Sequence, residues 1–512
     1  LLRQIVRPFG AVTSRAGDQP NQRARSLVRE TNGINKLEKG SLFSMSRELA
    51  ILSFTIFTVW LWHEDKKSRP HLSKALWIPL IWLLLLASRP LSWWSWFFFG
   101  LGSPSVSDLD GSALDRAFYS ALICLSLVVV IRRGVSWSEV FRGNTGLLLF
   151  YAFLGMTILW ATYPFPTFKR WTKELGAIPV LLIIVTDTNP IEAIKAVFTR
   201  CAFVIFTFSV LTIKYIPEIS RDYNRHSGIA EIHGICEQKN SLGEAVMVFG
   251  LVVFWQLLDY AGNKPRDYLK SPALQWVLTL LMGLWLLRQC DSKTSIIGLI
   301  VGAAMFVATK VQVLNKRRAI VWVCLVAVPM FVLLDNIFHV SGPILNVLGR
   351  DATLTNRTEI WAATKAHPVD PIFGCGYLNF WDMVGPIKLG ESAPVELKTA
   401  HNGYLEIFLD GGYLGILFLV IMLINAGKKH VRSFVHEYPG GVLAMAIFCM
   451  LLLTNISESV FARRGPLWSA FLLTTIGYRF LSRAPDHAEE DLTMENSYDF
   501  AVQPEATDLV PS

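Results

Sequence analysis

Long runs of apolar residues recur along this 512-residue chain, and they restrict its fold more than any other feature. Examples are ALWIPLIWLLLLAS and AIVWVCLVAVPMFVLL, neither of which contains a charged residue. Only 17% of the residues are charged, whereas soluble domains carry about 25%. A large soluble core is the alternative, but it does not explain why basic clusters recur at every second gap between the runs. The sequence therefore predicts a polytopic membrane protein.

About thirteen of these runs are candidates for membrane spans. Several are shorter than the roughly 20 residues that cross a bilayer, so flanking Trp, Tyr and Ser residues would extend them or neighbouring helices would shield them. We therefore expect an all-α fold, a polytopic transmembrane helical bundle of about 12–13 spans. The candidate spans are 49–62, 75–88, 117–131, 145–161, 174–186, 197–213, 242–260, 274–288, 294–309, 319–335, 404–425, 441–455 and 467–482.

The basic loops predict the orientation of the spans. Alternate gaps contain HEDKKSRP, IRRGVSWSEVFRGN, NKPRDYLK, NKRR and GKKHVR, which the positive-inside rule places in the cytoplasm. The net charge of +8 follows from this topology, and we expect no nucleic-acid partner. The gaps that then face outward are 89–116, 162–173, 214–241, 289–293, 336–403 and 456–466.

The predicted organisation has five parts. The basic, polar N-terminus resists the alternation, and MSRELAIL at Met45 resembles a natural start, so we expect a disordered or mis-started extension before it. The longest outward loop is too long for an idle connection. The parts are the extension 1–44, a transmembrane bundle 45–335 with the outer loop 214–241, the large outer loop 336–403, C-terminal transmembrane helices 404–482 and a disordered cytoplasmic tail 483–512.

Common catalytic and metal-binding motifs are missing from the sequence. It contains no Walker motif, no GxGxxG between a strand and a helix, and no HExxH. Its seven cysteines form no CxxC pair, so we expect neither a metal site nor a cofactor. Cys236 and Cys375 both fall in outward loops, where a disulfide can form, although we do not expect one.

The large outer loop contains a predicted short helix. Thr355 or Asn356 is its N-cap, and the helix runs from Arg357 to Lys365, before Pro368. Arg357 and Trp361 are four residues apart and share a face. One interpretation is an interfacial anchor, with Trp at headgroup level. The other is an anion clamp, because guanidinium binds phosphate bidentately. The sequence alone favours neither.

The segment TAHNGYLEIFLDGGYLG begins the next span with unusually polar residues. His401 is either a surface residue that caps the helix with Asn402 or a general base, since histidine suits proton transfer near neutral pH. Glu406 lies deeper and is a candidate to orient His401, although five residues along a helix is not an ideal stacking distance; alternatively, it pairs with an arginine for structural reasons. We expect a structural pairing with an arginine for Asp410, because intramembrane carboxylates are costly.

A second cationic cluster lies in the outer loop RDYNRHSGIAEIHGICEQKNSLGEA. Such a cluster outside the cytoplasmic loops suits a pyrophosphate ligand, which needs several cations. Alternatively, some of these cations pair with Asp222, Glu231 and Glu237. We expect at least one of Arg225 and Lys239 to bind phosphate. The cluster comprises Arg221, Arg225, His226, His233 and Lys239, and Lys293, Arg463 and Arg464 add charge on the same face.

The order of six motifs resembles the O-antigen ligase and polymerase superfamily, most closely its exopolysaccharide polymerase branch. The motifs are HGICEQKNSLGEA, CDSKTS, TLTNRTEIW, GCGYLNFW, AHNGYLEIFLDGGYLG and NISESVFARRGPLW. The resemblance implies a GT-C-like helical fold with one large periplasmic loop. It implies that His401 is the general base, and that Arg357 and Arg225, or Arg221, bind the pyrophosphate. Gln238 stands where a histidine often precedes KN, so Lys239 and Asn240 must serve that motif.

The resemblance also implies a function. The expected enzyme is an inverting, metal-independent glycosyltransferase that polymerises undecaprenyl-pyrophosphate-linked oligosaccharides on the periplasmic side of the bacterial inner membrane. Its expected partners are that oligosaccharide, a glycan acceptor, membrane lipid, and a chain-length regulator or export proteins. An O-antigen ligase that transfers glycan to a lipid A-core is one alternative, and a lipid-linked glycan transporter is another. Substrate contacts are expected from Asn402, Glu406 and Trp361 as well.

Overall fold

The computed structural model describes residues 45–101, 112–223, 230–263, 273–311, 319, 321, 357–387, 397–477 and 481. Three predicted features lie outside them: the extension 1–44, most of the span 319–335 and the tail 483–512. Helices make up nearly all of the described secondary structure, and its one sheet is the two-stranded hairpin of β1 (Arg221–Tyr223) and β2 (Ala230–Ile232). The all-α polytopic prediction is confirmed.

Among the described residues, six helices are long and apolar enough to cross a membrane, and a bent pair is a candidate seventh span. The six are α6 (Ala113–Arg132), α11 (Pro190–Tyr215), α13 (Lys239–Asn263), α14 (Ala273–Cys290), α15 (Lys293–Lys310) and α20 (Gly403–Val435). The bent pair joins α4 (Trp77–Ala87) to α5 (Leu91–Phe99) at 77°. Shorter apolar helices are α8 (Thr145–Met156), α10 (Ala177–Val185), α21 (Gly441–Ser457) and α22 (Pro466–Ile476).

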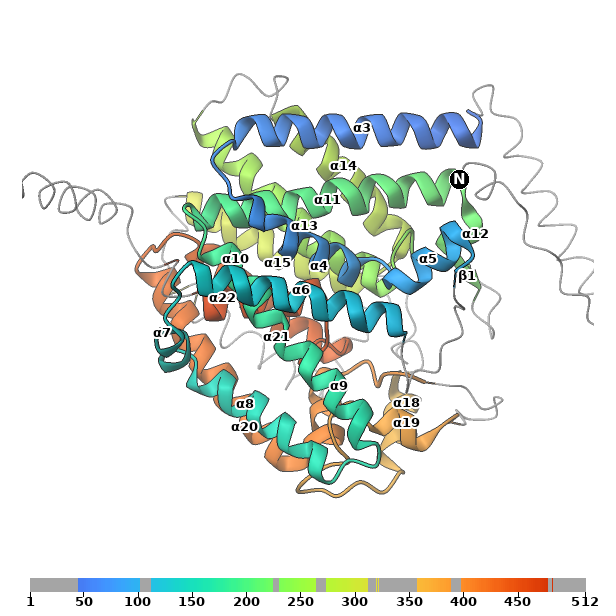
Figure 1. Cartoon of the computed structure of the whole chain (residues 1–512), viewed down its shortest axis with the longest axis vertical. Helices are drawn as coiled ribbons and strands as arrows, with labels where there is room; N and C mark the ends of the chain where they lie inside the picture. Colours follow the sequence, from blue (N-terminus) through green and yellow to red (C-terminus); the bar gives the residue numbers. More distant parts are fainter. Residues whose placement is uncertain are drawn as a thin grey trace, which may run out of the picture.

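The centre of the bundle is formed by α11, which packs against α13, α14 and α4 (Figure 1). In the most apolar 18-residue stretch of α11, 83% of the residues are buried, whereas only 22% are buried in the same stretch of α6. A helix that is apolar all round is buried by its neighbours or faces lipid. The helix α11 is therefore internal, whereas α6 and the outer helix α3 (Arg47–Ser68), with exposed Ile56 and Val59, present apolar side chains at the periphery.

A break near the start of α20 redirects the chain. Gly412 has a φ of 60°, and a Cβ there would come within 2.4 Å of the Ile372 carbonyl group. The break interrupts the helical hydrogen bonds, and a neighbouring loop replaces them: the Cys375 N–H donates to the Leu409 carbonyl at 2.9 Å. Only glycine accommodates both the positive φ and the close approach. At the break, the last carbonyl groups of the first two turns of α20 therefore bond to the loop and not to the next turn of the helix.

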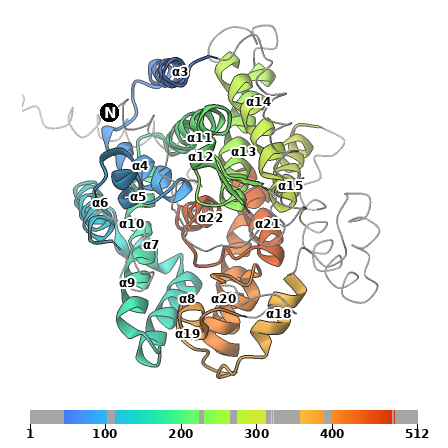
Figure 2. The ribbon, with the colours of Figure 1, turned by 90° about the vertical axis from the view of Figure 1, so that its right-hand side faces the viewer.

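The candidate site residues gather at the end of the bundle where α13 and α20 begin and α21 ends, which we call the site end. Figure 2 looks onto it and shows α18 (Arg357–Lys365), α19 (Phe380–Val384) and α20 together, with α21 and α22 above them. The helix α18 confirms the predicted bounds. The remaining short helices are α7 (Trp137–Arg142), α9 (Pro164–Leu175), α12 (Pro217–Ser220) and the 3₁₀ turns η1 (Lys74–Leu76) and η2 (Thr157–Leu159).

Candidate active site

Three remote segments meet at one carboxylate, Glu458, immediately after α21. Its Oε1 accepts hydrogen bonds from Arg357 Nη2 at 2.6 Å and from Asn240 Nδ2 at 2.9 Å. Its Oε2 lies 3.0 Å from His401 Nδ1. The Glu458 side chain is only 16% exposed, so these charge-assisted contacts are partly shielded from water. Glu458 therefore joins the predicted base to the predicted arginine.

His401 is held in a fixed orientation. A carboxylate accepts hydrogen bonds, so Nδ1 is the nitrogen that donates to Glu458, and Nε2 is the nitrogen left to act as an acceptor. Within the described residues, Nε2 has no hydrogen-bond partner, and the side chain is 26% exposed. A ring fixed through one nitrogen, with the other accessible, has the geometry of a general base.

The loop that carries His401 is fastened to the segment after α21. His401 has a φ of 50°, an uncommon left-handed backbone conformation. Asn402 caps α20, since its side chain accepts from the Leu405 N–H at 3.0 Å. The Gly403 N–H donates to the Glu458 carbonyl at 3.0 Å, so the backbones of the two segments are bonded as well as their side chains.

Glu406 pairs with an arginine, which was the alternative to a role in orienting His401, and the His401 ring is held by Glu458 instead. The Glu406 carboxylate, 1% exposed, accepts from the Ala400 N–H at 2.6 Å and from Arg463 Nη2 at 2.5 Å. His401 precedes the N-cap Asn402 and has a φ of 50°, so it does not continue the helix that carries Glu406. Glu406 instead fixes the backbone just before His401.

Asp410 also differs from the prediction. Its Oδ1 accepts from the Leu378 N–H at 2.9 Å, and the close arginine ion pair belongs to Glu406. The break in α20 explains this, because it brings the loop containing Leu378 against the buried carboxylate. Asp410 thus ties that loop to α20.

The predicted face of α18 packs against the His401 loop. Trp361 Nε1 donates to the Ala400 carbonyl at 2.8 Å, one turn from the contact between Arg357 and Glu458. Neither of the two sequence interpretations included this arrangement. The tryptophan fixes the backbone beside the base, and the arginine reaches the carboxylate that holds the base.

The other predicted cations have different surroundings. Lys239 Nζ pairs with Glu231 at 2.8 Å, as the alternative interpretation allowed. Arg221 Nη2 donates to the Ile213 carbonyl at 3.1 Å, and no contact with Glu458 is found among the described residues. Arg225 lies outside the described residues. Asn240 is the predicted residue from this part of the sequence that contacts Glu458.

The two cysteines of the outer loops are free and buried. Cys375 Sγ contacts the Leu409 carbonyl at 3.2 Å, and burial raises the pKa of its thiol well above the usual range. Cys236 is also fully buried, with its pKa raised by burial. Both thiols therefore pack as small apolar groups.

Sequence analysis missed Glu458. The motif NISESVFARRGPLW was noted for its arginines, and the carboxylate within it was not assigned a role. The available signal was an acidic residue at the end of an apolar run, in a gap expected to face the same side as His401. Residues that pair across more than 50 positions cannot be matched from one sequence, because spacing constrains only local contacts.

Comparisons with known proteins show what the chain is similar to. Residues 277–420 match a family model described as O-Antigen ligase, a segment that includes both Arg357 and His401. The Exopolysaccharide production protein ExoQ of Rhizobium meliloti (strain 1021) is 24% identical over 350 residues, which cover 64% of this chain and 73% of that protein. Together with the apolar helices, these matches describe a multi-pass membrane protein that resembles the O-antigen ligase/polymerase superfamily.

Proposed function

We propose that this protein, a relative of the O-antigen ligases and polymerases, is a membrane glycosyltransferase that polymerises undecaprenyl-pyrophosphate-linked glycan units. In this proposal the site end faces the periplasm of a bacterial inner membrane. The observation that supports it most directly is the contact of His401 Nδ1 with Glu458, beside Arg357. A base oriented by a carboxylate, next to a guanidinium, suits transfer of a sugar from a phosphate leaving group.

The proposed reaction is a direct displacement. An acceptor sugar hydroxyl lies against His401 Nε2, which takes its proton as the oxygen bonds to the anomeric carbon. The bond from that carbon to the pyrophosphate oxygen breaks, and configuration inverts because attack and departure occur on opposite faces. Glu458 stabilises the imidazolium that forms, as a carboxylate does for the histidine of a catalytic triad.

Arg357 is proposed to bind the departing pyrophosphate. Guanidinium has five N–H donors in a rigid fork, so contact with Glu458 through Nη2 is compatible with phosphate contacts through its other nitrogens. Electrostatic help of this kind is strongest in a shielded site, and the Arg357 side chain is only 11% exposed. The arginine would therefore take the place of a metal ion in this step.

A ligase is the second candidate, because the matching family model is described as O-Antigen ligase. The site chemistry would be unchanged, and only the acceptor would differ. The third candidate is a lipid-linked glycan transporter, which would not need an imidazole held by a carboxylate. The histidine geometry thus favours an enzyme over a carrier.

Replacement of His401 tests the enzyme proposal. His401→Ala should abolish glycan transfer in membranes while the protein still inserts, because the base is lost; undiminished transfer would exclude His401 as the base. Arg357→Lys keeps the charge but loses the fork, so full activity in that variant would argue against phosphate clamping. Deletion of the protein decides between the acceptors: single repeat units without long polymer indicate a polymerase, and accumulated lipid-linked polymer indicates a ligase.

A further inference from the structure

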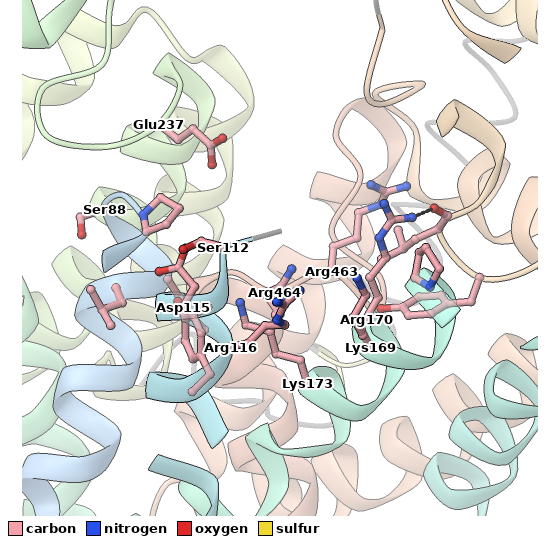
Figure 3. Close-up of a pocket in the computed structure, with 17 residues that line it drawn as sticks. Ser88, Ser112, Asp115, Arg116, Lys169, Arg170, Lys173, Glu237, Arg463 and Arg464 are labelled. Carbon is pink, nitrogen blue, oxygen red and sulfur yellow. Dashed lines mark hydrogen bonds between the residues drawn. The ribbon is translucent and has the colours of Figure 1, made fainter. Parts of the chain in front are cut away.

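The loop that joins α21 to α22, residues 458–465, carries two residues that shape the candidate active site. Glu458, at its start, holds His401 Nδ1 at 3.0 Å. Arg463, near its end, binds Glu406 at 2.5 Å and lines a cavity of about 470 Å³ beside α9 (Figure 3). What fixes this loop in place therefore also fixes the carboxylate that orients the base.

A carboxylate of α13 holds the far end of the loop. Glu244 Oε1 accepts a hydrogen bond from the Leu467 N–H, in the first turn of α22, at 2.8 Å. The N–H groups of a first turn have no partner within their own helix, and a side chain at the N-cap usually binds one of them. The N-cap of α22 is Gly465, which has no side chain to do so. Glu244 supplies the missing acceptor from a different helix, so it joins α13 to the start of α22.

Gly465 allows the carboxylate to come this close to the backbone. A Cβ on Gly465 would lie only 2.7 Å from Glu244 Oε1, so a larger residue would displace the carboxylate, the loop or both. The φ of Gly465 is −170°, which is ordinary extended backbone that other residues also adopt. The glycine is therefore required by the contact with Glu244 and not by the backbone conformation.

Two residues of α13 hold the two ends of the loop from one face of the helix. Asn240 donates to Glu458, at the start of the loop, at 2.9 Å, and Glu244 binds the Leu467 N–H just beyond its end. Asn240 and Glu244 are four residues apart, so they lie about one turn apart on the same side of the helix. Because the geometry of a helical turn is fixed, α13 sets the distance between the two anchored ends of the loop.

Between its ends the loop is fixed through its backbone. The side chain of Asn455, which is fully buried, accepts from the Val460 N–H at 2.9 Å and from the Phe461 N–H at 3.0 Å. Ala462 has a φ of 50°, and its carbonyl accepts a hydrogen bond from the buried Tyr377 hydroxyl. A loop whose groups are bound in this way is expected to move as one body, so a displacement at α22 is transmitted to the start of the loop.

We propose that Glu244 is a positioning residue for the general base and acts through the loop and Glu458. By anchoring the far end of the loop to α13, it keeps the Glu458 carboxylate where it binds His401 Nδ1. This inference rests on the proposed glycosyl transfer, in which His401 is the base. The role requires an acceptor oxygen on residue 244 and not a negative charge, because the bond is to a neutral backbone N–H.

Two assays on the full-length protein in nanodiscs test the proposal. Transfer is measured with lipid-linked glycan isolated from cells that lack the protein, and donor affinity with labelled undecaprenyl diphosphate. Glu244→Ala should lower kcat about tenfold, because the base is misplaced, and leave donor affinity unchanged. Glu244→Gln keeps an oxygen that accepts from the Leu467 N–H and should retain nearly full kcat. Glu218→Ala is the matched control, because it removes a carboxylate that pairs with Arg47 at the surface.

Gly465→Ala perturbs the same contact from its other side. The added Cβ overlaps Glu244 Oε1, so kcat should fall about tenfold when Glu244 is present. In the Glu244→Ala background, the space left by the carboxylate accommodates the methyl group, and Gly465→Ala should then lower kcat about twofold or less. Substitutions at residues in contact combine in this non-additive way, whereas those at independent residues add.

Each outcome decides one point. Full kcat in Glu244→Ala, equal losses in Glu244→Ala and Glu244→Gln, or additive losses in the pair with Gly465→Ala would each overturn the proposal. A fall in donor affinity that matches the fall in kcat would do the same. If Glu244→Ala does not insert, Gly465→Ala decides, and it must lower kcat with donor affinity unchanged. His401→Ala is measured in parallel: transfer retained there rejects the proposed function, whereas transfer lost there and kept in Glu244→Ala rejects only the role of Glu244.

Discussion

Glu458→Gln is expected to remove catalysis while leaving the shape of the site intact. The carboxylate uses both of its oxygens, Oε1 for Arg357 and Asn240 and Oε2 for His401. Glutamine has the same size, but one oxygen becomes an NH₂ group that only donates. An NH₂ that faces Arg357 opposes two donors, so the amide is expected to turn this group toward His401.

That orientation reverses the histidine tautomer. Nδ1 must then accept a hydrogen bond, Nε2 carries the proton, and the nitrogen that faces the acceptor hydroxyl can no longer remove a proton. General-base catalysis contributes about 10²–10⁴-fold, so we expect kcat to fall about 10³-fold, equivalent to about 4 kcal/mol in activation free energy. Donor binding should change far less, since the Arg357 contact is retained.

The assay is glycan transfer by purified protein in nanodiscs, with donor affinity measured in parallel. Glu359→Gln is the matched control, because it makes the same chemical change at an exposed residue of α18 and should leave kcat unaltered. A Glu458→Gln enzyme with nearly full kcat would refute the assignment of Glu458 as the residue that orients the base. A loss of donor affinity equal to the loss of kcat would show that the carboxylate acts mainly through Arg357.

Two further predictions concern the surrounding structure. Gly412→Ala should lower the free energy of unfolding by about 1–3 kcal/mol, because a residue with a side chain is strained at this positive φ. Gly250→Ala is the control and should not lower it, because the nearest atom to an added Cβ is 3.9 Å away. Thermal unfolding in detergent compares the two variants. Trp361→Phe removes one hydrogen bond to the His401 loop, worth about 1 kcal/mol, and should reduce kcat about fivefold; an unchanged kcat would show that the loop is held without it.

Local helices and individual charged residues could be predicted from the sequence. The helix Arg357–Lys365 follows from its caps and from the proline beyond it, and the structure has the same bounds. The apolar runs predicted the helical bundle, because twenty apolar residues without charge have few other stable environments. His401 and Arg357 were both singled out, and the structure brings them to one carboxylate.

The partners of these residues were harder to predict. Glu406 was one candidate for the orienting acid because it lies close in sequence, but the loop that carries His401 is bonded to the segment after α21, and Glu458 is the neighbour instead. The ion pair between Glu406 and Arg463 likewise needs α20 and the loop before α22 in contact. Such contacts depend on how helices pack, and a single sequence gives no distance between separate segments.

The shared carboxylate makes the roles of its three partners inseparable. Arg357, His401 and Asn240 all bind Glu458, and none of the three can be removed without changing the setting of the other two. Losses measured in single variants should consequently not add up, as is usual for groups that act as a unit. Substitutions tolerated during divergence would have to occur in combination, so the three segments are expected to vary together among related proteins.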